Sequence, residues 1–390
     1  MRRRFILGIA LGDDKKVIKP SSNGQQSPNM VFIEYRHFHA RPEIYIMLKL
    51  RPILVSISLA LSIGTAHAAP MPDGVVYSAN EGDGSISAIE LRTGAVSTTS
   101  ISITPHNVQI SPDGQILLAV GSPKSGSKEH GDHGGHGQTE AGDKGLLLLE
   151  SEQPANVLKA LPSGNHPAHV VTSQDGRYAY ITNTDNDLLT VVDTQLEIVA
   201  AEVDTGSYPH GLRLSPDGAE LYIANVTDNS VSVIDTENLK ETARIHVGQA
   251  PVQVAYTPDG KYVYVSLRDE NKVAIIDTET REVVDRVSVG RNPIQLFAAS
   301  DAKMYVANQG DAADPDDSVT VIDTNNRTVV STIVTGKGAH GLVASDDGDF
   351  MFVTNNVDNT VSAIDVRKEK VIATFLVGPN PNGITYRSVR

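Results

Sequence analysis

A segment of about 42 residues recurs along most of this chain, and the repeat limits what the chain can fold into. Glycines mark its period, with spacings of 42, 42, 42, 46 and 42 residues, at Gly164, Gly206, Gly248, Gly290, Gly336 and Gly378. Each unit holds four short runs rich in β-branched and aromatic residues, separated by turn sequences such as Ser-Pro-Asp-Gly. Four short strands per repeat predict one blade of a β-propeller, in which stacked repeats share a continuous core.

The chain contains six complete units, and the seventh is divided between its two ends. Residues 381–386 read as a first strand with nothing after it, and residues 72–80 read as a turn and second strand with nothing before them. Joined, they make one blade and remove the exposed edges that an open ring would leave. We therefore predict an all-β fold, a seven-bladed β-propeller of four-stranded antiparallel blades over residues 69–390, closed by a blade that both termini share.

The residues before the propeller have the features of an export signal. Residues 47–68 combine a basic start, an apolar stretch too short to cross a bilayer comfortably and the small-residue sequence Ala-His-Ala. They predict a signal peptide cut after Ala68, and therefore a periplasmic or secreted protein; an uncleaved anchor is the alternative. We interpret residues 1–46 as a mis-called start or a disordered extension.

Composition excludes several kinds of site. The chain has no cysteine, which rules out disulfides, thiolate metal sites and covalently attached haem. Its 33 basic and 47 acidic residues give a net charge of −14, and no basic patch stands out that would attract nucleic acid. An acidic surface instead suits the attraction of cations. We expect a monomer with no membrane association beyond the signal peptide.

One motif occurs at the same point of four repeats. It follows a turn like Ser-Pro-Asp-Gly, precedes a sequence like Val-x-Val-Ile-Asp-Thr, and reads YITN (180–183), YIAN (222–225), YVAN (305–308) and FVTN (352–355). This pattern resembles the YVTN-repeat propellers, exported proteins called YncE-like in bacteria and surface-layer-like in archaea. The resemblance covers residues 71–390 and implies the fold, but says little about function, because the fold hosts many activities. The blade beginning at Gly248 departs from it, with Ser266-Leu267 in place of the Thr/Ala-Asn pair.

Strand direction places most histidines on one end of the ring, which we call the upper face. The first strand of each blade starts after a Gly-x-x-Pro loop and the second returns, so the residues after the proline and the second-to-third loops share this face. After the proline stand His106, Ala168, His210, Val252, Ile294, His340 and Asn382. Because blades are about 51° apart, we expect His106, His210 and His340 to be spread trigonally around the tunnel mouth. His166 and His169 belong to the blade between the first two.

A long loop adds further histidines to the upper face. The insertion at residues 123–145 is rich in glycine, and its histidines have the spacing H-x-x-H-x-x-H. Histidines with carboxylates and no sulfur suit zinc or copper. The predicted metal ligands are His106, His210, His340, His169 and His166, supplied by His130, His133 and His136 of the loop. Exported zinc metallochaperones on a propeller scaffold are similar in having a His-rich loop above the ring.

We therefore predict an exported zinc or copper chaperone or buffer, with a periplasmic metal-transport or redox protein as its partner. The alternative without metal binding is that these histidines cap strands or fill the tunnel mouth and that the loop is a solvated linker. Motifs such as G-x-S-x-G and H-E-x-x-H are missing, which argues against an enzyme. A lactone hydrolase remains an alternative, because seven-bladed lactonases use scattered upper-face residues. A platform that binds a redox partner or envelope component is the other.

Overall fold

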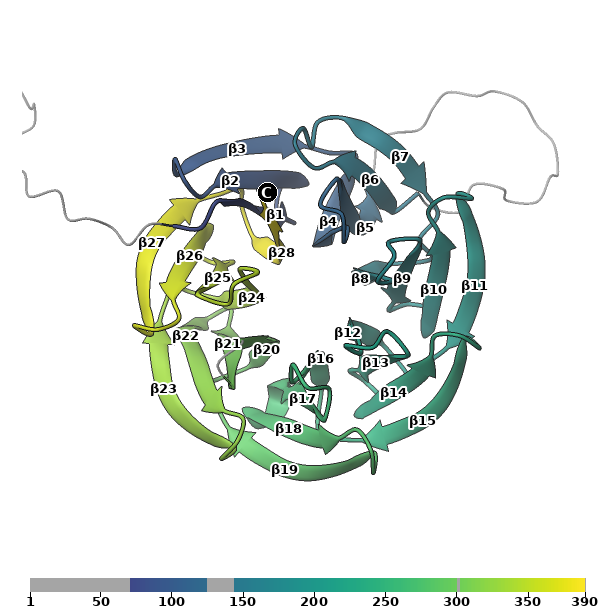
Figure 1. Cartoon of the computed structure of the whole chain (residues 1–390), viewed down its shortest axis with the longest axis vertical. Coiled ribbons are helices and arrows are strands. Elements are labelled where there is room, and N and C mark those ends of the chain that lie inside the picture. Colours follow the sequence, from purple (N-terminus) through teal and green to yellow (C-terminus); the bar gives the residue numbers. More distant parts are fainter. Residues whose placement is uncertain (1–70, 125–143, 300–301, 390) are drawn as a thin grey trace, which may run out of the picture. The chain divides into compact units, whose positions relative to one another are not determined.

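The computed structural model describes residues 71–124, 144–299 and 302–389. These residues form seven four-stranded antiparallel sheets arranged in a ring (Figure 1), which confirms the predicted all-β propeller. The predicted signal peptide, the segment before it, and the loop residues His130, His133 and His136 lie outside the described residues. Within the described ranges, no helix reaches the length and hydrophobicity that a bilayer crossing requires.

Each blade runs from an inner strand at the tunnel to an outer strand at the rim. The closing blade contains β28 (Pro381–Ser388), β1 (Gly74–Asn80), β2 (Ser85–Glu90) and β3 (Ala95–Ser100). The next three contain β4 (Ile103–Ile110), β5 (Ile116–Pro123), β6 (Leu146–Glu150) and β7 (Val157–Leu161); β8 (Pro167–Thr172), β9 (Tyr178–Asn183), β10 (Leu188–Asp193) and β11 (Ile198–Asp204); and β12 (Pro209–Leu214), β13 (Glu220–Asn225), β14 (Ser230–Asp235) and β15 (Lys240–His246).

The last three blades follow the same pattern, with one short helix between two strands. They contain β16 (Pro251–Tyr256), β17 (Tyr262–Leu267), the 3₁₀ helix η1 (Arg268–Glu270), β18 (Lys272–Asp277) and β19 (Glu282–Ser288); β20 (Pro293–Ala299), β21 (Lys303–Asp311), β22 (Asp314–Asp323) and β23 (Thr328–Val334); and β24 (Ala339–Ala344), β25 (Phe350–Asn355), β26 (Thr360–Asp365) and β27 (Lys370–Leu376).

The two chain ends close the ring by pairing with each other. Strand β28 runs antiparallel to β1, from Gly74 opposite Ser388 to Asn80 opposite Pro381. The inner strands then contact one another in the order β28, β4, β8, β12, β16, β20 and β24, and β24 returns to β28. This arrangement confirms the blade predicted from the two incomplete repeat units.

Apolar side chains pack between the faces of neighbouring blades. In one such layer, Tyr222 and Val233 of one blade pack with Val254 and Val265 of the next, and all four are buried. Alternate residues of a strand point to opposite faces, and both faces of each sheet meet another sheet. The strands therefore read as almost continuous apolar runs, as Tyr222–Ala224 does.

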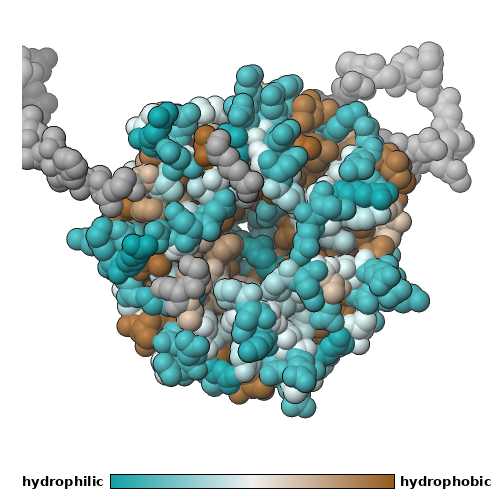
Figure 2. Space-filling model, in the orientation of Figure 1, coloured by the Kyte–Doolittle hydropathy of each residue, from teal (hydrophilic) through white to brown (hydrophobic). Residues whose placement is uncertain are grey.

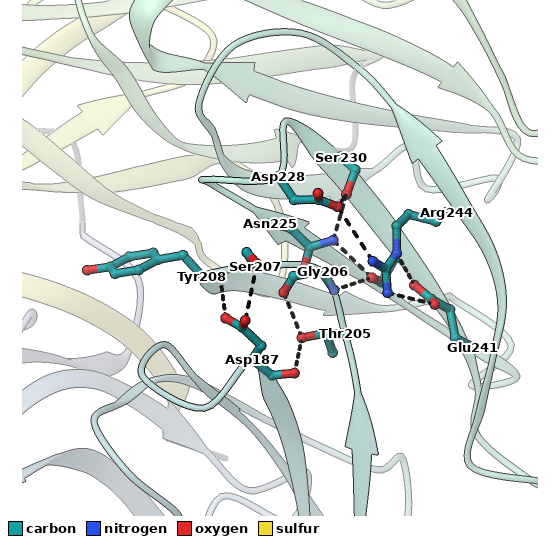
Figure 3. A network of polar contacts seen from close by, with 11 residues as sticks. Asp187, Thr205, Gly206, Ser207, Tyr208, Asn225, Asp228, Ser230, Glu241 and Arg244 are labelled. Carbon is teal, nitrogen blue, oxygen red and sulfur yellow. Dashed lines mark hydrogen bonds and ion pairs between the residues drawn. The ribbon is translucent and has the colours of Figure 1, made fainter.

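The motif asparagine connects three parts of its own blade. The Asn225 side-chain amide donates to Ser230 Oγ at 3.0 Å and to Ser232 Oγ at 2.9 Å, and Ser230 in turn donates to Asp228 Oδ2 at 2.8 Å. Figure 3 shows this network between the second and third strands and the chain at Gly206. Equivalent bonds join Asn80, Asn183, Asn308 and Asn355 to hydroxyl groups of their own blades. The motif asparagines described here therefore stabilise their own blades through hydrogen bonds.

The periodic glycine is required because the motif asparagine lies against it. A Cβ added at Gly206 would stand 2.6 Å from Asn225 Nδ2, and one at Gly290 would stand 2.4 Å from the side chain of Asn308. Such distances lie well inside van der Waals contact. Two blades lack the asparagine, and in the one that begins at Gly248 a Cβ added there would stand 2.5 Å from Glu270 Oε1 and 2.6 Å from Leu267 Cδ1. Apart from Gly248, the glycines that mark the sequence repeat are thus the ones that contact the motif asparagines.

Replacing Asn225 by alanine should destabilise the protein by about 2 kcal/mol, because buried polar groups lose their partner. The free energy of unfolding in urea measures the change. Asn238→Ala is the matched control, since Asn238 is an exposed turn residue, and it should cost less than about 0.5 kcal/mol. Equal losses for the two variants would contradict the role given to the motif asparagine.

Candidate metal centre at the mouth of the ring

Three histidines from three consecutive blades meet at the upper face. His106 lies on β4, His169 on β8 and His210 on β12. Each offers a ring nitrogen, and these three nitrogens lie within 4.8 Å of one another. Since β8 stands between β4 and β12 in the ring, a contact between His106 and His210 must pass in front of β8. The cluster therefore lies toward the hollow at the centre of the ring (Figure 2).

The three imidazoles are packed edge to face. The ring centroids of His106 and His210 are 5.2 Å apart, those of His106 and His169 are 5.5 Å apart, and those of His169 and His210 are 4.8 Å apart. The shortest approach is between His106 Nε2 and His210 Nε2, at 3.3 Å. Two ring nitrogens thus point at almost the same place.

Two of these rings are oriented by acceptors on their far side. His210 Nδ1 lies 3.2 Å from the backbone oxygen of Val252, and His106 Nδ1 lies 3.4 Å from Glu81 Oε1. The Asn382 side-chain amide donates to the other Glu81 oxygen and lies 3.4 Å from His106 Nδ1. The Val252 carbonyl favours a proton on His210 Nδ1, which leaves the Nε2 lone pair of His210 facing His106. His106 Nδ1 lies between a carboxylate acceptor and the Asn382 amide donor, so these contacts admit either tautomer of His106.

The motif threonine fixes the backbone at the tunnel mouth. Thr182 of β9 donates its hydroxyl to the backbone oxygen of His210 at 2.6 Å. Ser266 and Thr354 make the same bond to the next blade, to the backbone oxygens of Ile294 and Asn382. The third residue of the repeat motif thus positions the backbone of the residue at the tunnel mouth in the next blade. For Thr182 that residue is His210, a candidate ligand.

Burial keeps His169, His210 and His340 neutral. It lowers the pKa of His210 to about 3 and that of His340 to about 4, and the cost of a second positive charge beside His106 acts in the same direction. Burial, followed by the charges of His210 and His106, holds the pKa of His169 well below its usual range. Burial raises the pKa of the Glu81 carboxyl, but His106 and His340 outweigh this, so the pKa lies below the ordinary value. Neutral imidazoles beside a carboxylate are the form that binds metal.

One side chain of the cluster is buried and lacks a hydrogen-bond partner. His169 is 4% exposed, and its Nδ1 has no partner among the described residues. Its position corresponds to Asn107, Gln253 and Gln295 in other blades, of which Asn107 and Gln295 accept a backbone N–H of the next blade. An unpaired buried nitrogen is costly unless something binds it.

Two further predicted ligands within the described residues, His340 and His166, lie outside this cluster. His340 is buried on β24, its Nδ1 also lacks a partner among the described residues, and it is not one of the three clustered histidines. The compact group thus contains His169 where the trigonal arrangement had His340. His166 is exposed, with Nδ1 3.2 Å from Asp185 Oδ1. It lines, with His106 and His210, a cavity of about 70 Å³.

Sequence reasoning missed the residues that orient the ligands. Glu81 follows β1 in the turn before β2, and nothing in its local sequence distinguishes it from other turn acids. Asn382 was recognised as a mouth residue, but its contact with Glu81 arises only when the two chain ends pair. Thr182 belongs to the repeat motif, so its bond to the neighbouring blade could have been predicted from the position of the motif.

The fold and the cluster define a seven-bladed β-propeller with a histidine group at its mouth. The model of the YncE-like beta-propeller family matches residues 215–314, and the model of the seven-bladed beta-propeller lactonases matches residues 143–255. Each match covers less than a third of the chain, and together with the seven blades they show that the chain is similar to these propeller families. No curated protein sequence matches the chain significantly.

Solved structures share the architecture at low sequence identity. A chain of hydrazine synthase from Kuenenia stuttgartiensis is 18% identical over 72% of this chain and 88% of its own length, with a TM-score of 0.58. A functionally unknown protein from Desulfotomaculum acetoxidans DSM 771 is 14% identical over 81% of this chain and 99% of its own, with a TM-score of 0.65. At these identities the likeness is one of fold alone.

The metal-free protein should lose stability between pH 6.5 and about 4 partly through these histidines. The unfolded chain takes up protons near the ordinary histidine pKa of about 6.5, whereas folded His210 does so only near about 3, so acid favours unfolding across that window. His210→Gln should therefore reduce the stability lost between pH 7.5 and pH 5 by about 1–2 kcal/mol, measured by urea unfolding in EDTA. His246→Gln, at an exposed histidine on β15, should leave the pH dependence unchanged; an unchanged His210→Gln profile would contradict the prediction.

Proposed function

We propose that this protein is an exported metal-binding propeller that holds zinc or copper at His106, His169 and His210 and serves as a chaperone or buffer. The single observation that carries the proposal is the 3.3 Å approach of the Nε2 atoms of His106 and His210, with a third imidazole beside them. A periplasmic metal-transport or redox protein is the partner we propose. The signal sequence at residues 47–68 is the basis for export.

The spacing of the nitrogens supports a tetrahedral metal. Zinc–nitrogen bonds of about 2.0–2.1 Å at the tetrahedral angle place two ligand nitrogens about 3.3–3.4 Å apart. The two Nε2 atoms of His106 and His210 are 3.3 Å apart. His169 completes the set through a small side-chain movement, because its nitrogen lies within 4.8 Å of the others. Three imidazoles then leave a fourth position open to water, cargo exchange or a partner's ligand.

The hydrogen bonds behind the rings are compatible with a metal between them. In the tautomer with His106 Nδ1 protonated toward Glu81 and His210 Nδ1 protonated toward Val252, the two Nε2 atoms face each other with no proton between them. A cation between them relieves this repulsion. Carbonyl and carboxylate acceptors behind ligand histidines are also the usual outer shell of protein metal sites.

Titration with Zn²⁺ and with Cu²⁺ tests the proposal. We expect one tight site per chain, weakened by at least about 100-fold in each of His106→Ala, His169→Ala and His210→Ala, because each removes a direct ligand. Calorimetry gives the affinities, and elemental analysis of protein from its native compartment identifies the bound metal. His246→Ala is the control, since that exposed histidine lies on an outer strand.

Two further variants separate the ring from the loop. Replacing His130, His133 and His136 together by serine should remove additional, weaker sites and leave the tight one. His340→Ala should affect affinity less than the cluster variants, because His340 lies outside the cluster. Affinity no better than millimolar, or affinity unaffected by the three cluster substitutions, would reject the metal proposal.

Glu81→Gln should weaken Zn²⁺ binding by about tenfold without removing a direct ligand. The substitution keeps the size of the side chain but removes the charge that favours a proton on His106 Nδ1. Calorimetry at one pH gives the change, and Glu152→Gln, an exposed acid paired with Arg387, serves as the control. Equal affinities for Glu81→Gln and the unaltered protein would show that this carboxylate does not support the site.

A hydrolase is the second candidate, favoured by the match of the lactonase model to residues that include His169 and His210. A metal with an open position can lower the pKa of bound water to about 7 and so supply a nucleophile. Hydrolysis of lactones above the buffer rate, lost in His210→Ala together with the metal, would favour this activity. Tight metal binding without hydrolysis would favour the chaperone or buffer.

A further inference from the structure

An arginine reaches across the tunnel below the histidine cluster. Arg213 lies on inner strand β12, and its Cζ stands 5.9 Å from the centroid of the Phe297 ring on β20. The inner strands contact one another in the order β12, β16 and β20, so β16 separates the two residues along the ring. The arginine side chain must therefore pass in front of β16, inside the central hollow that Figure 2 shows.

This guanidinium meets no negative charge among residues 71–124, 144–299 and 302–389. It donates from Nη1 to the backbone oxygen of Leu212 at 3.3 Å and lies over Phe297, and no carboxylate stands within ion-pair distance. Surrounding protein lowers the pKa of Arg213 to about 10 by desolvation alone. By contrast, Arg177, Arg281 and Arg327 each contact both an aromatic ring or hydroxyl and a carboxylate.

The inner strands around Arg213 provide no carboxylate. All seven lie within the described ranges and contain no Asp or Glu. At the position equivalent to Arg213 the ring carries Gln109, Val171, Ala255, Phe297, Val343 and Thr385. Arg387, the other inner-strand arginine, pairs with Glu152 at 3.4 Å. A chain with a net charge of −14 thus has a tunnel wall whose charged side chains are positive.

Arg213 is half-buried, and a partly desolvated cation without a partner is costly, so an anion that binds it removes this cost. The planar guanidinium presents a fork of donors that matches two oxygens of a carboxylate or phosphate. Most donors of Arg213 remain free, since the described contacts use one Nη1 bond to Leu212.

We propose that the tunnel below the histidine cluster binds a small oxyanion, a carboxylate or phosphate group, through Arg213. The anion would lie between this arginine and the three histidines. The site exists in the metal-free protein, so it does not depend on the proposed metal. A metal at the histidines would add positive charge above the anion and strengthen its binding.

The test uses metal-free protein in EDTA, with inorganic phosphate and acetate titrated separately. Each ligand that binds should raise the melting temperature with concentration, and calorimetry should give a dissociation constant. Arg213→Met keeps the aliphatic stem and should abolish the response. In the absence of anion its melting temperature should equal or exceed that of the unaltered protein, because an unpaired charge is removed. The probe with the lower dissociation constant identifies the preferred oxyanion group.

Two matched variants make the result specific. Arg286→Met is the control, because Arg286 is an exposed arginine on outer strand β19 that likewise donates to a backbone oxygen, that of Val247. It should bind both anions like the unaltered protein. Arg213→Lys keeps the charge without the fork and should weaken binding by about tenfold, which covers the case in which Arg213→Met fails to fold.

The inference is overturned if neither anion stabilises the unaltered protein at millimolar concentration, or if Arg213→Met or Arg213→Lys binds as the unaltered protein does. Repeating the titration with Zn²⁺ present separates this site from the proposed metal centre. Loss of Zn²⁺ binding in His210→Ala with anion binding retained shows two distinct sites. Anion binding only in the presence of metal would contradict a site formed by Arg213.

Discussion

The contact between a motif asparagine and a periodic glycine is the constraint on which this propeller depends. The asparagine amide bonds hydroxyl groups of its own blade, and only a glycine leaves room for it where the chain enters that blade. The contact recurs in five of the seven blades, where it fixes the same connection into the inner strand. The inner strands therefore present equivalent positions to the tunnel, and a residue's place in the repeat decides its height on the wall.

The candidate site follows from that regularity and from its exceptions. Equivalent positions carry His106 and His210, and the next position along carries His169, so three rings from consecutive blades converge. The threonine of one motif holds the backbone of the next blade's mouth residue, which links scaffold and site directly. The strand that supplies His210, β12, also supplies Arg213, three residues further along the strand. The side chains that could bind a ligand are thus a few histidines and one arginine, on inner strands whose other side chains are mostly apolar or carry amides.

Most of the fold could be predicted from the sequence, because a fixed period, turn residues and β-branched runs all specify one blade. The shared closing blade was also predictable from its two incomplete halves. The exact membership of the histidine cluster was not. Angular spacing alone suggested His340, whereas the cluster joins three consecutive blades and takes His169 from one position further along its strand. Glu81 could not be found because turn acids are common and its partner Asn382 is 301 residues away.

The closing blade gives the site a dependence on the order of synthesis. Glu81 leaves the ribosome among the first residues of the propeller and Asn382 among the last, yet both stand behind the same imidazole. The orientation of His106 is therefore settled only when translation has ended and the last strand has docked. A nascent or C-terminally truncated chain can hold the three histidines in its early blades, but it lacks half of the support behind them.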